Sequence, residues 1–211
     1  MSDELEERLK ELAEYDKKIL DLAKDMLQTD KIFPLDYLAS TVMNRTLSLI
    51  DAYIVLARDS NFLAAAHLIR PNLDNYLRFY AAWIVDKPHD FANSVMDGEQ
   101  VRKMKDRTGA KMTDTYLVDK VKVEYPWIAS LYDDTSGFVH LSRQHVISSL
   151  RYSDQNGGVI EGYIGRKDPL IPDEWKVEAT SAMIMITKIV CKLVYGWTWT
   201  KANPGKTPDE E

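Results

Sequence analysis

The sequence has a single cysteine, no excess of basic residues and no long uninterrupted apolar run. Cys191 has no partner for a disulfide within the chain, which is typical of proteins kept in a reducing compartment. Asp and Glu (33) outnumber Lys and Arg (27), so the formal net charge of −6 argues against a broadly basic surface for nucleic acid, although not against a local basic pocket. The first residues are acidic rather than an apolar leader, and we expect a cytoplasmic protein.

The most apolar stretch, residues 179–200, contains two lysines. Lys188 and Lys192 are four residues apart and therefore share one helical face. A membrane-spanning helix needs about 20 mostly apolar residues, and lysines within the bilayer cost it several kcal/mol. Apolar residues of this stretch recur at spacings of three and four, namely Met185, Ile186, Ile189, Val190, Leu193, Val194 and Trp197. The pattern predicts an amphipathic core helix over 173–199 and no association with a membrane.

Periodicity along the chain predicts an all-α protein, a helical bundle of about six to seven helices with a small inserted β-hairpin. Helices are expected over residues 3–28, 34–58, 62–85, 113–125, 127–142 and 173–199, with a weaker one within 89–105. The helices over 34–58 and 62–85 are apolar nearly all round, so they belong at the centre of the bundle. Two β-prone runs, 146–152 and 159–164, flank an Asn-Gly-Gly turn and predict the hairpin.

The predicted domain organisation has three parts. Residues 1–30 form an amphipathic helix that packs on the body or on a partner, with an apolar seam of Leu5, Leu9, Leu12, Ile19, Ala23 and Met26 that Asp16 interrupts. Residues 31–200 form a single helical-bundle domain with the hairpin near 146–164, and residues 201–211 form a disordered tail. Within the domain, the charged segment 86–112 is expected to be a mobile excursion.

One face of the 62–85 helix is polar, although the rest of this helix is apolar. His67, Arg70, Asp74 and Arg78 are three or four residues apart and stack on that face. Charges on a helix meant for the interior must be paired or must face a cavity. Pro71 cannot donate to the carbonyl of His67, which predicts a kink. The stripe is either a polar cleft in which Arg70 accepts an anion or a structural ion-pair network at the solvent edge.

A second polar face lies on the 127–142 helix. Tyr132, Ser136 and His140 repeat every four residues and share this face. A histidine beside a tyrosine and a serine can act as a general acid or base near neutral pH. A lone histidine on a helix also occurs as a core or capping residue. His140 is the one catalytic candidate of the sequence.

The spacings that usually hold a metal or a nucleophile are missing from the sequence. It contains no Glu-x-x-His or His-Glu-x-x-His pair. Cys191 has no cysteine or histidine near it in the sequence, and neither a Gly-x-Ser-x-Gly motif nor a phosphate-binding glycine loop occurs. We therefore expect neither a metal site nor a cofactor.

Two segments together resemble a known family. They are residues 68–76 (LIRPNLDNY) and residues 131–140 (LYDDTSGFVH). An apolar helix with an arginine, followed later by a Ser-x-aromatic-x-His segment, resembles a bacterial family of helical proteins that is similar to the HEPN-like bundles. Many of those bundles belong to toxin–antitoxin and phage-defence systems. The resemblance covers residues 35–145.

The resemblance implies a bundle, often dimeric, with a polar groove in which Arg70 and His140 lie. We expect this groove to bind an anionic ligand (a nucleotide, RNA or a small molecule), in a bacterial defence or toxin–antitoxin context. The expected ligand-binding residues are Arg70, Asp74, His67, Arg45, Asn44, Tyr132 and Ser136. Active HEPN ribonucleases carry an Arg-x4–6-His motif, and no arginine here has a histidine at that spacing. Whether the protein is an enzyme is left open. One alternative is a metal-independent RNase that uses His140 and Arg70. Another is a non-catalytic structural or interaction module, with the N-terminal helix as the surface for a homodimer or a partner protein.

Overall fold

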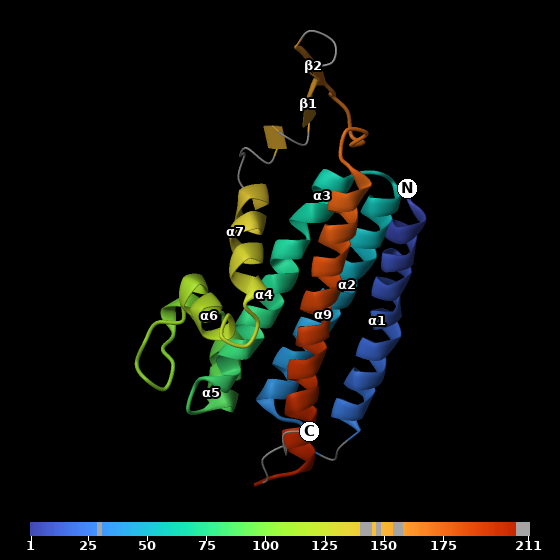
Figure 1. Ribbon diagram of the computed structural model, residues 1–211. Helices are drawn as coiled ribbons and strands as arrows, with labels where there is room; N and C mark the ends of the chain where they lie inside the picture. The colour runs from blue at the N-terminus through green and yellow to red at the C-terminus, as the bar shows by residue number, and fades with distance from the viewer. Residues whose placement is uncertain (29–30, 140–144, 147–148, 154–157, 206–211) are drawn as a thin grey trace.

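The computed structural model of the chain is a helical bundle with a β-hairpin at one end (Figure 1). It describes residues 1–28, 31–139, 145–146, 149–153 and 158–205. The helices are α1 (Asp3–Leu27), α2 (Pro34–Arg58), α3 (Phe62–His67), α4 (Ile69–Tyr80), α5 (Pro88–Met96), α6 (Asp114–Val121), α7 (Trp127–Val139) and α9 (Asp173–Ala202), with short 3-10 helices η1 (Ala81–Trp83) and η2 (Val101–Lys103). The prediction of an all-α bundle with a small β element is confirmed.

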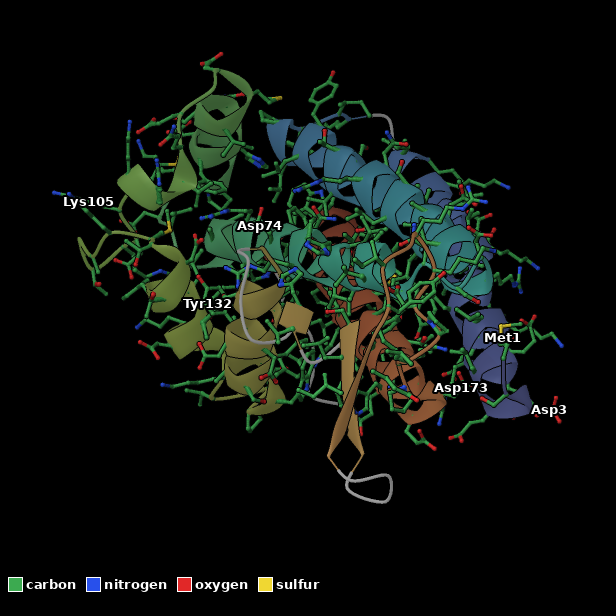
Figure 2. The ribbon with its side chains drawn as sticks, turned by 90° about the horizontal axis from the view of Figure 1, so that it is seen from above. Met1, Asp3, Asp74, Lys105, Tyr132 and Asp173 are labelled. Carbon is green, nitrogen blue, oxygen red and sulfur yellow. The ribbon has the colours of Figure 1, made fainter. Side chains whose placement is uncertain are left out.

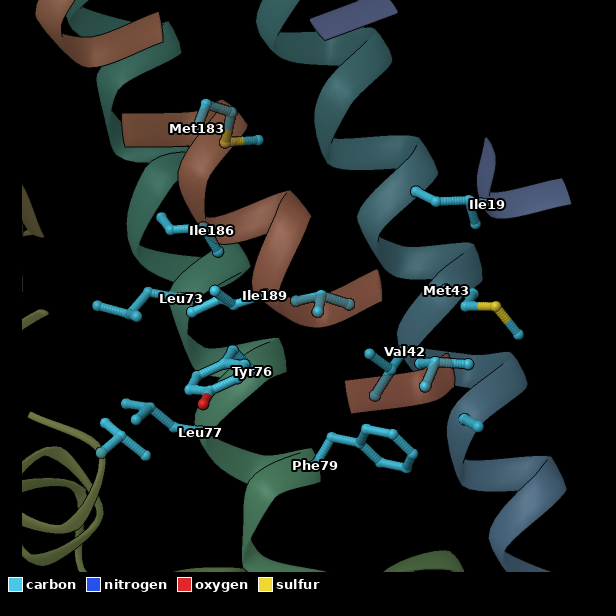
Figure 3. Packing of buried hydrophobic residues seen from close by; sticks show 14 of the residues in the cluster. Ile19, Val42, Met43, Leu73, Tyr76, Leu77, Phe79, Met183, Ile186 and Ile189 are labelled. Carbon is cyan, nitrogen blue, oxygen red and sulfur yellow. The ribbon is translucent and has the colours of Figure 1, made fainter. Parts of the chain in front are cut away.

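Four helices, α1, α2, α4 and α9, form the core of the bundle. α1 packs on α2 and α9, and α4 packs on the same two helices from the other side. Figure 3 shows side chains from α2, α4 and α9 directed into the space between them, among them Val42, Tyr76 and Ile186. The central position predicted for the 34–58 helix is confirmed, and α4, from the expected 62–85 helix, packs against it.

The N-terminal helix belongs to this core. Leu9, Leu12 and Ile19 are at most 1% exposed, and α1 lies against α9 and α2. Tyr15, which is 9% exposed, completes the apolar seam where Asp16 was expected to interrupt it. The apolar seam of α1 is therefore buried on the body of the protein, and a homodimer or partner contact through this helix stays a prediction.

The expected continuous helix over 62–85 is broken into α3, α4 and η1. Pro71 has no N–H to donate to the carbonyl of His67, and the break falls at Leu68, whose N–H bonds the carbonyl of Ala65 at 2.9 Å in a tighter turn. This interruption lies three residues before Pro71, where the sequence predicts a kink. The expectation of one continuous helix over 62–85 is wrong. The apolar periodicity continues across the break, so the pattern of apolar residues did not indicate it.

The charged segment 86–112 packs on the bundle, contrary to the expectation of a mobile excursion. Phe91 and Met112 are buried in the main core. The guanidinium group of Arg107 donates to the carbonyls of Trp83 (2.5 Å) and Ile84 (3.2 Å), which lie at the end of η1. These bonds satisfy carbonyl groups that a helix end leaves without partners. The high content of charged residues in this segment did not indicate mobility, because one of them, Arg107, binds backbone carbonyl groups of the bundle.

The hairpin is shorter than expected. β1 (Leu150–Ser153) pairs antiparallel with β2 (Val159–Gly162), and Ser153 lies opposite Val159. The expected strands 146–152 and 159–164 overlap both, and the hairpin projects from the end of the bundle near α3 (Figure 1). Its turn residues 154–157 lie outside the described residues.

The C-terminal helix extends further than the sequence predicts. α9 ends at Ala202, so Lys201 does not belong to a disordered tail. Its side chain is 2% exposed and binds the carboxylate of Asp36 at 2.8 Å, because this buried carboxylate of α2 needs a cationic partner. Residues 206–211 lie outside the described residues. No helix of the described chain, α9 included, is long and apolar enough to cross a membrane.

Candidate functional site

Three arginines and two aspartates meet where α2, α4, α6 and α7 come together. In the view from above, Asp74 of α4 and Tyr132 of α7 lie on the side of the bundle away from α1 (Figure 2). Ion pairs connect the charged side chains into one network. We call this set the arginine cluster, and it consists of Arg45, Arg70, Asp74, Arg78 and Asp114.

Arg70 is held by α6 and α7. Its Nη1 donates to the carbonyl of Tyr132 at 3.0 Å and to the hydroxyl of Ser136 at 2.9 Å. The guanidinium carbon lies 3.5 Å from the centre of the Tyr132 ring, a distance that gives a cation–π interaction. Its Nη2 lies 3.9 Å from Asp114, and the side chain is 17% exposed. Arg70, Tyr132 and Ser136, which the sequence predicts at one site, are thus brought together, with Arg70 joining α4 to α7.

Asp74 lies between the other two arginines. The Nε of Arg78 donates to its Oδ1 at 3.0 Å, and the Nη1 of Arg45 lies 3.6 Å from its Oδ2. Arg78 also forms an ion pair with Asp114 through Nη2. The pair of Asp74 with Arg78 is the one expected from their spacing of four residues. Within the described chain Arg70 pairs with Asp114 and not with Asp74, the other partner that its spacing allows.

The arginine cluster has more cationic than anionic groups. Its three guanidinium groups and two carboxylates leave a formal charge of 3 − 2 = +1. The Nη1 of Arg78 is buried and has no hydrogen-bond partner among the described residues. A buried donor without a partner lowers stability by about 1–3 kcal/mol, and by more when the group is charged. Arg45, in contrast, is 49% exposed and can meet a ligand from solvent.

A line of buried amide and hydroxyl groups continues the cluster into the bundle. The Nη1 of Arg45 donates to Asn75 at 2.9 Å, Asn75 donates to Thr46 at 3.1 Å, and Asn72 donates to Thr187 at 3.2 Å. The four uncharged side chains are at most 2% exposed. Satisfied buried networks hold their members in one arrangement, so Arg45 is oriented from inside the protein. None of these four uncharged residues was among the predicted site residues, although two asparagines one turn apart on a core helix were a visible signal.

Three predicted site residues are not part of the arginine cluster or lie outside the described residues. Asn44 is exposed on α2, where its carbonyl accepts a hydrogen bond from Ser48 at 3.1 Å. The Nδ1 of His67 lies 2.7 Å from the carbonyl of Leu63, and its ring centre lies 5.7 Å from that of His145. His140 lies outside the described residues, so its catalytic role stays a prediction.

Two cluster members were absent from the predicted site residues. Arg78 lies on the polar stripe that the sequence shows, one turn after Asp74, so the signal was present. Asp114 begins α6 beside its capping residue Thr113. Its contact with Arg78 links α6 to α4 across 36 positions, and no local pattern reports such a contact.

The side chains of the arginine cluster are chemically suited to binding an anionic group. Guanidinium groups stay protonated at physiological pH and present several N–H donors in a fixed fork that matches carboxylate or phosphate oxygens. Within the described residues no group of three or more His, Cys, Asp or Glu side chains is placed to hold a metal ion. The cluster therefore offers a cationic surface supported by buried hydrogen bonds.

Comparison with known proteins adds no assignment to this geometry. The chain matches no protein-family model, no curated protein and no solved structure. The resemblance to HEPN-like bundles therefore stays a prediction from the sequence.

Proposed function

We propose that the protein binds an anionic ligand at the arginine cluster, and that Arg45 and Arg78 make the direct contacts. The observation that carries the proposal is the buried Nη1 of Arg78, which has no partner among the described residues, in a cluster with a formal charge of +1. An anionic oxygen bound at Arg45 and at the exposed part of Arg78, whose side chain is 26% exposed, would balance the charge. A shift of the Arg78 side chain toward the ligand would then give the unpartnered Nη1 an acceptor. Phosphate is the group that fits best because it offers several oxygens to two guanidinium groups at once.

Arg45 and Arg78 share Asp74 as a partner. Each interacts with one oxygen of the Asp74 carboxylate, so the two guanidinium groups lie close together. A ligand oxygen bound between them would interact with both guanidinium groups beside Asp74. Arg70 would act as a positioning residue, because Tyr132, Ser136 and Asp114 already engage its guanidinium group. This engagement also argues against Arg70 as the phosphate-stabilising group of a ribonuclease.

Substitution of Arg45 tests the proposal. Arg45→Gln removes the charge from an accessible side chain, and we expect the affinity for pyrophosphate, measured by isothermal titration calorimetry at low ionic strength, to fall at least about tenfold. Arg58→Gln is the matched control, since Arg58 lies on the same helix, is 45% exposed and pairs with Glu6 at 2.8 Å. This control should bind like the unsubstituted chain.

Two results would contradict the proposal. One is that the unsubstituted chain does not bind pyrophosphate. The other is that Arg45→Gln and Arg58→Gln bind pyrophosphate with the same affinity. Either would leave the arginine cluster as a structural ion-pair network. Cleavage of a single-stranded RNA that disappears in His140→Ala, with thermal stability unchanged, would instead support the RNase alternative.

A further inference from the structure

One face of α9 carries charges of opposite sign on its two halves. Six residues recur along it at spacings of three and four, which places them on one stripe of an α-helix. We call them the α9 stripe, and they are Glu174, Glu178, Ser181, Met185, Lys188 and Lys192. The charged members are exposed, and Met185 in the middle is 40% exposed. The first half of the stripe is therefore acidic and the second half is basic.

The α9 stripe is complementary to itself when it is reversed. If a second copy is laid antiparallel across it, centred on Met183, Glu174 comes level with Lys192 and Glu178 with Lys188. Ser181, a small residue, comes level with Met185. In a two-fold dimer the same patch of each copy faces the other, so every such match occurs twice. The matched charges span about 27 Å of helix at 1.5 Å per residue.

The folding of α9 by itself does not account for this arrangement. Glu174 and Glu178 are like charges four residues apart, as are Lys188 and Lys192, and such pairs disfavour a helix. The helix dipole favours acidic residues in the first turn, where Glu174 lies, and basic ones in the last. It does not account for Glu178, Lys188 or Lys192, which lie between these turns because α9 continues to Ala202. Lys192 pairs with Glu124 at 2.9 Å but remains 67% exposed. The charges of the α9 stripe thus remain accessible to another molecule.

Apolar surface lies beside these charges. Trp175 is 43% exposed. Two hollows adjoin the stripe, one of about 230 Å³ lined by Trp175 and Glu178 and one of about 500 Å³ lined by Trp127 and Met185. In Figure 1, α9 lies at the front of the bundle between α1 and α7, and no described helix crosses in front of it. Exposed apolar side chains give a contact its affinity, and the charges around them set its orientation.

We propose that two copies of this chain pair through the α9 stripe in an antiparallel, two-fold-symmetric dimer. The charges select a second copy as the occupant because the stripe matches its own reverse. Met185 of each copy packs over Ser181 of the other. The proposal does not depend on anion binding, since the arginine cluster lies on other helices.

Charge reversal in two halves tests the dimer. The variant Glu174→Lys/Glu178→Lys makes the charged stripe wholly basic, and Lys188→Glu/Lys192→Glu makes it wholly acidic. Sedimentation equilibrium at low salt should give twice the mass of one chain for the unsubstituted protein and the mass of one chain for each variant. An equal mixture of the two variants should regain the doubled mass, because every lysine of one then meets a glutamate of the other.

Matched controls separate this effect from net charge. Glu4→Lys/Glu7→Lys and Lys10→Glu/Lys17→Glu change the net charge equally at exposed positions of α1, and both should dimerise like the unsubstituted chain. Circular dichroism checks that all variants remain helical. A monomeric unsubstituted chain, stripe variants that still dimerise alone, or a mixture that stays monomeric would each overturn the proposal.

Discussion

Arg70 shows how the surroundings of a single side chain determine its role. The sequence places it on a polar stripe as the residue that accepts an anion. In the structure its guanidinium group bonds the backbone and a hydroxyl of α7 and stacks on Tyr132. A guanidinium group has five N–H donors in a rigid fork, and protein groups occupy those of Nη1. Arg45, whose side chain is 49% exposed, is therefore the most accessible of the three arginines, ahead of Arg78 at 26%.

Asp106 organises the loop before α6 by accepting several hydrogen bonds. Its carboxylate accepts from the hydroxyl groups of Tyr116 and Thr108 and from the backbone N–H groups of Thr108 and Ala110. The Tyr116 hydroxyl above all, together with the other donors, holds the pKa of the Asp106 carboxyl well below its usual range. The ionised form is therefore the one that the folded loop stabilises.

This depressed pKa predicts a loss of stability in acid. A carboxyl whose pKa is lower in the folded than in the unfolded state contributes stability above its unfolded pKa, near 3.9, and loses it as the pH falls further. We expect the melting temperature to drop below about pH 4, and Asp106→Asn to make that drop smaller. Thermal unfolding followed by circular dichroism between neutral and acidic pH measures both. Parallel pH profiles for the two proteins would contradict the role given to Asp106.

At the scale of elements, the break at Leu68 divides one predicted helix into α3 and α4, which both pack on α2 and α7. His67, at the end of α3, lies near His145, and Arg70, at the start of α4, contacts α7. The break lies three residues before Pro71, which removes one backbone donor from the helix.

The N-terminal helix is a structural element of the core, which yields a stability prediction. Leu12 is fully buried, so we expect Leu12→Ala to lower the free energy of unfolding by about 2–5 kcal/mol through lost burial and the cavity left behind. Leu20→Ala on the same helix is the control, since Leu20 is 53% exposed, and its effect should stay within about 0.5 kcal/mol. Urea unfolding measures both variants. Equal effects would mean that α1 does not pack as described.

At the scale of the whole molecule, the arginine cluster lies at the junction of two parts. One part is the four-helix core, and the other consists of α6 and α7, which pack on α4 on the side away from α1 (Figure 1). Arg70 and Arg78 connect α4 to both α6 and α7. Ion pairs at such a junction contribute to stability and also create the cationic surface proposed to bind a ligand.

The thiol of Cys191 offers a probe of global unfolding. Burial raises its pKa to about 11, so at pH 8 very little of it is the reactive thiolate. We expect the native chain to react slowly with a disulfide reagent such as DTNB, and the chain in concentrated urea to react rapidly with one thiol per molecule. The absorbance change on labelling measures both rates. Similar rates in the two states would contradict the half-buried position of Cys191 on α9.

Much of the fold could be predicted from the sequence, but less of the site. The range 34–58 coincides with α2, because Pro34 and a strong apolar pattern mark this helix locally. Tyr132 and Ser136 were correctly placed near Arg70, since each polar face was visible on its own helix. The ion pair of Lys201 with Asp36 was not predicted, because the burial of a residue depends on which elements pack over it.

The amino-acid order by itself determined where the chain is helical, where it turns and which faces are apolar, because those properties depend on neighbours three or four residues away. The folded arrangement decided which charges neutralise one another and which remain accessible. Asp114 and Arg78 are 36 positions apart, and Arg45 and Asn75 are 30 apart. Electrostatic and hydrogen-bond energies depend on distance in space, and only the packing of α2, α4, α6 and α7 brings these groups together.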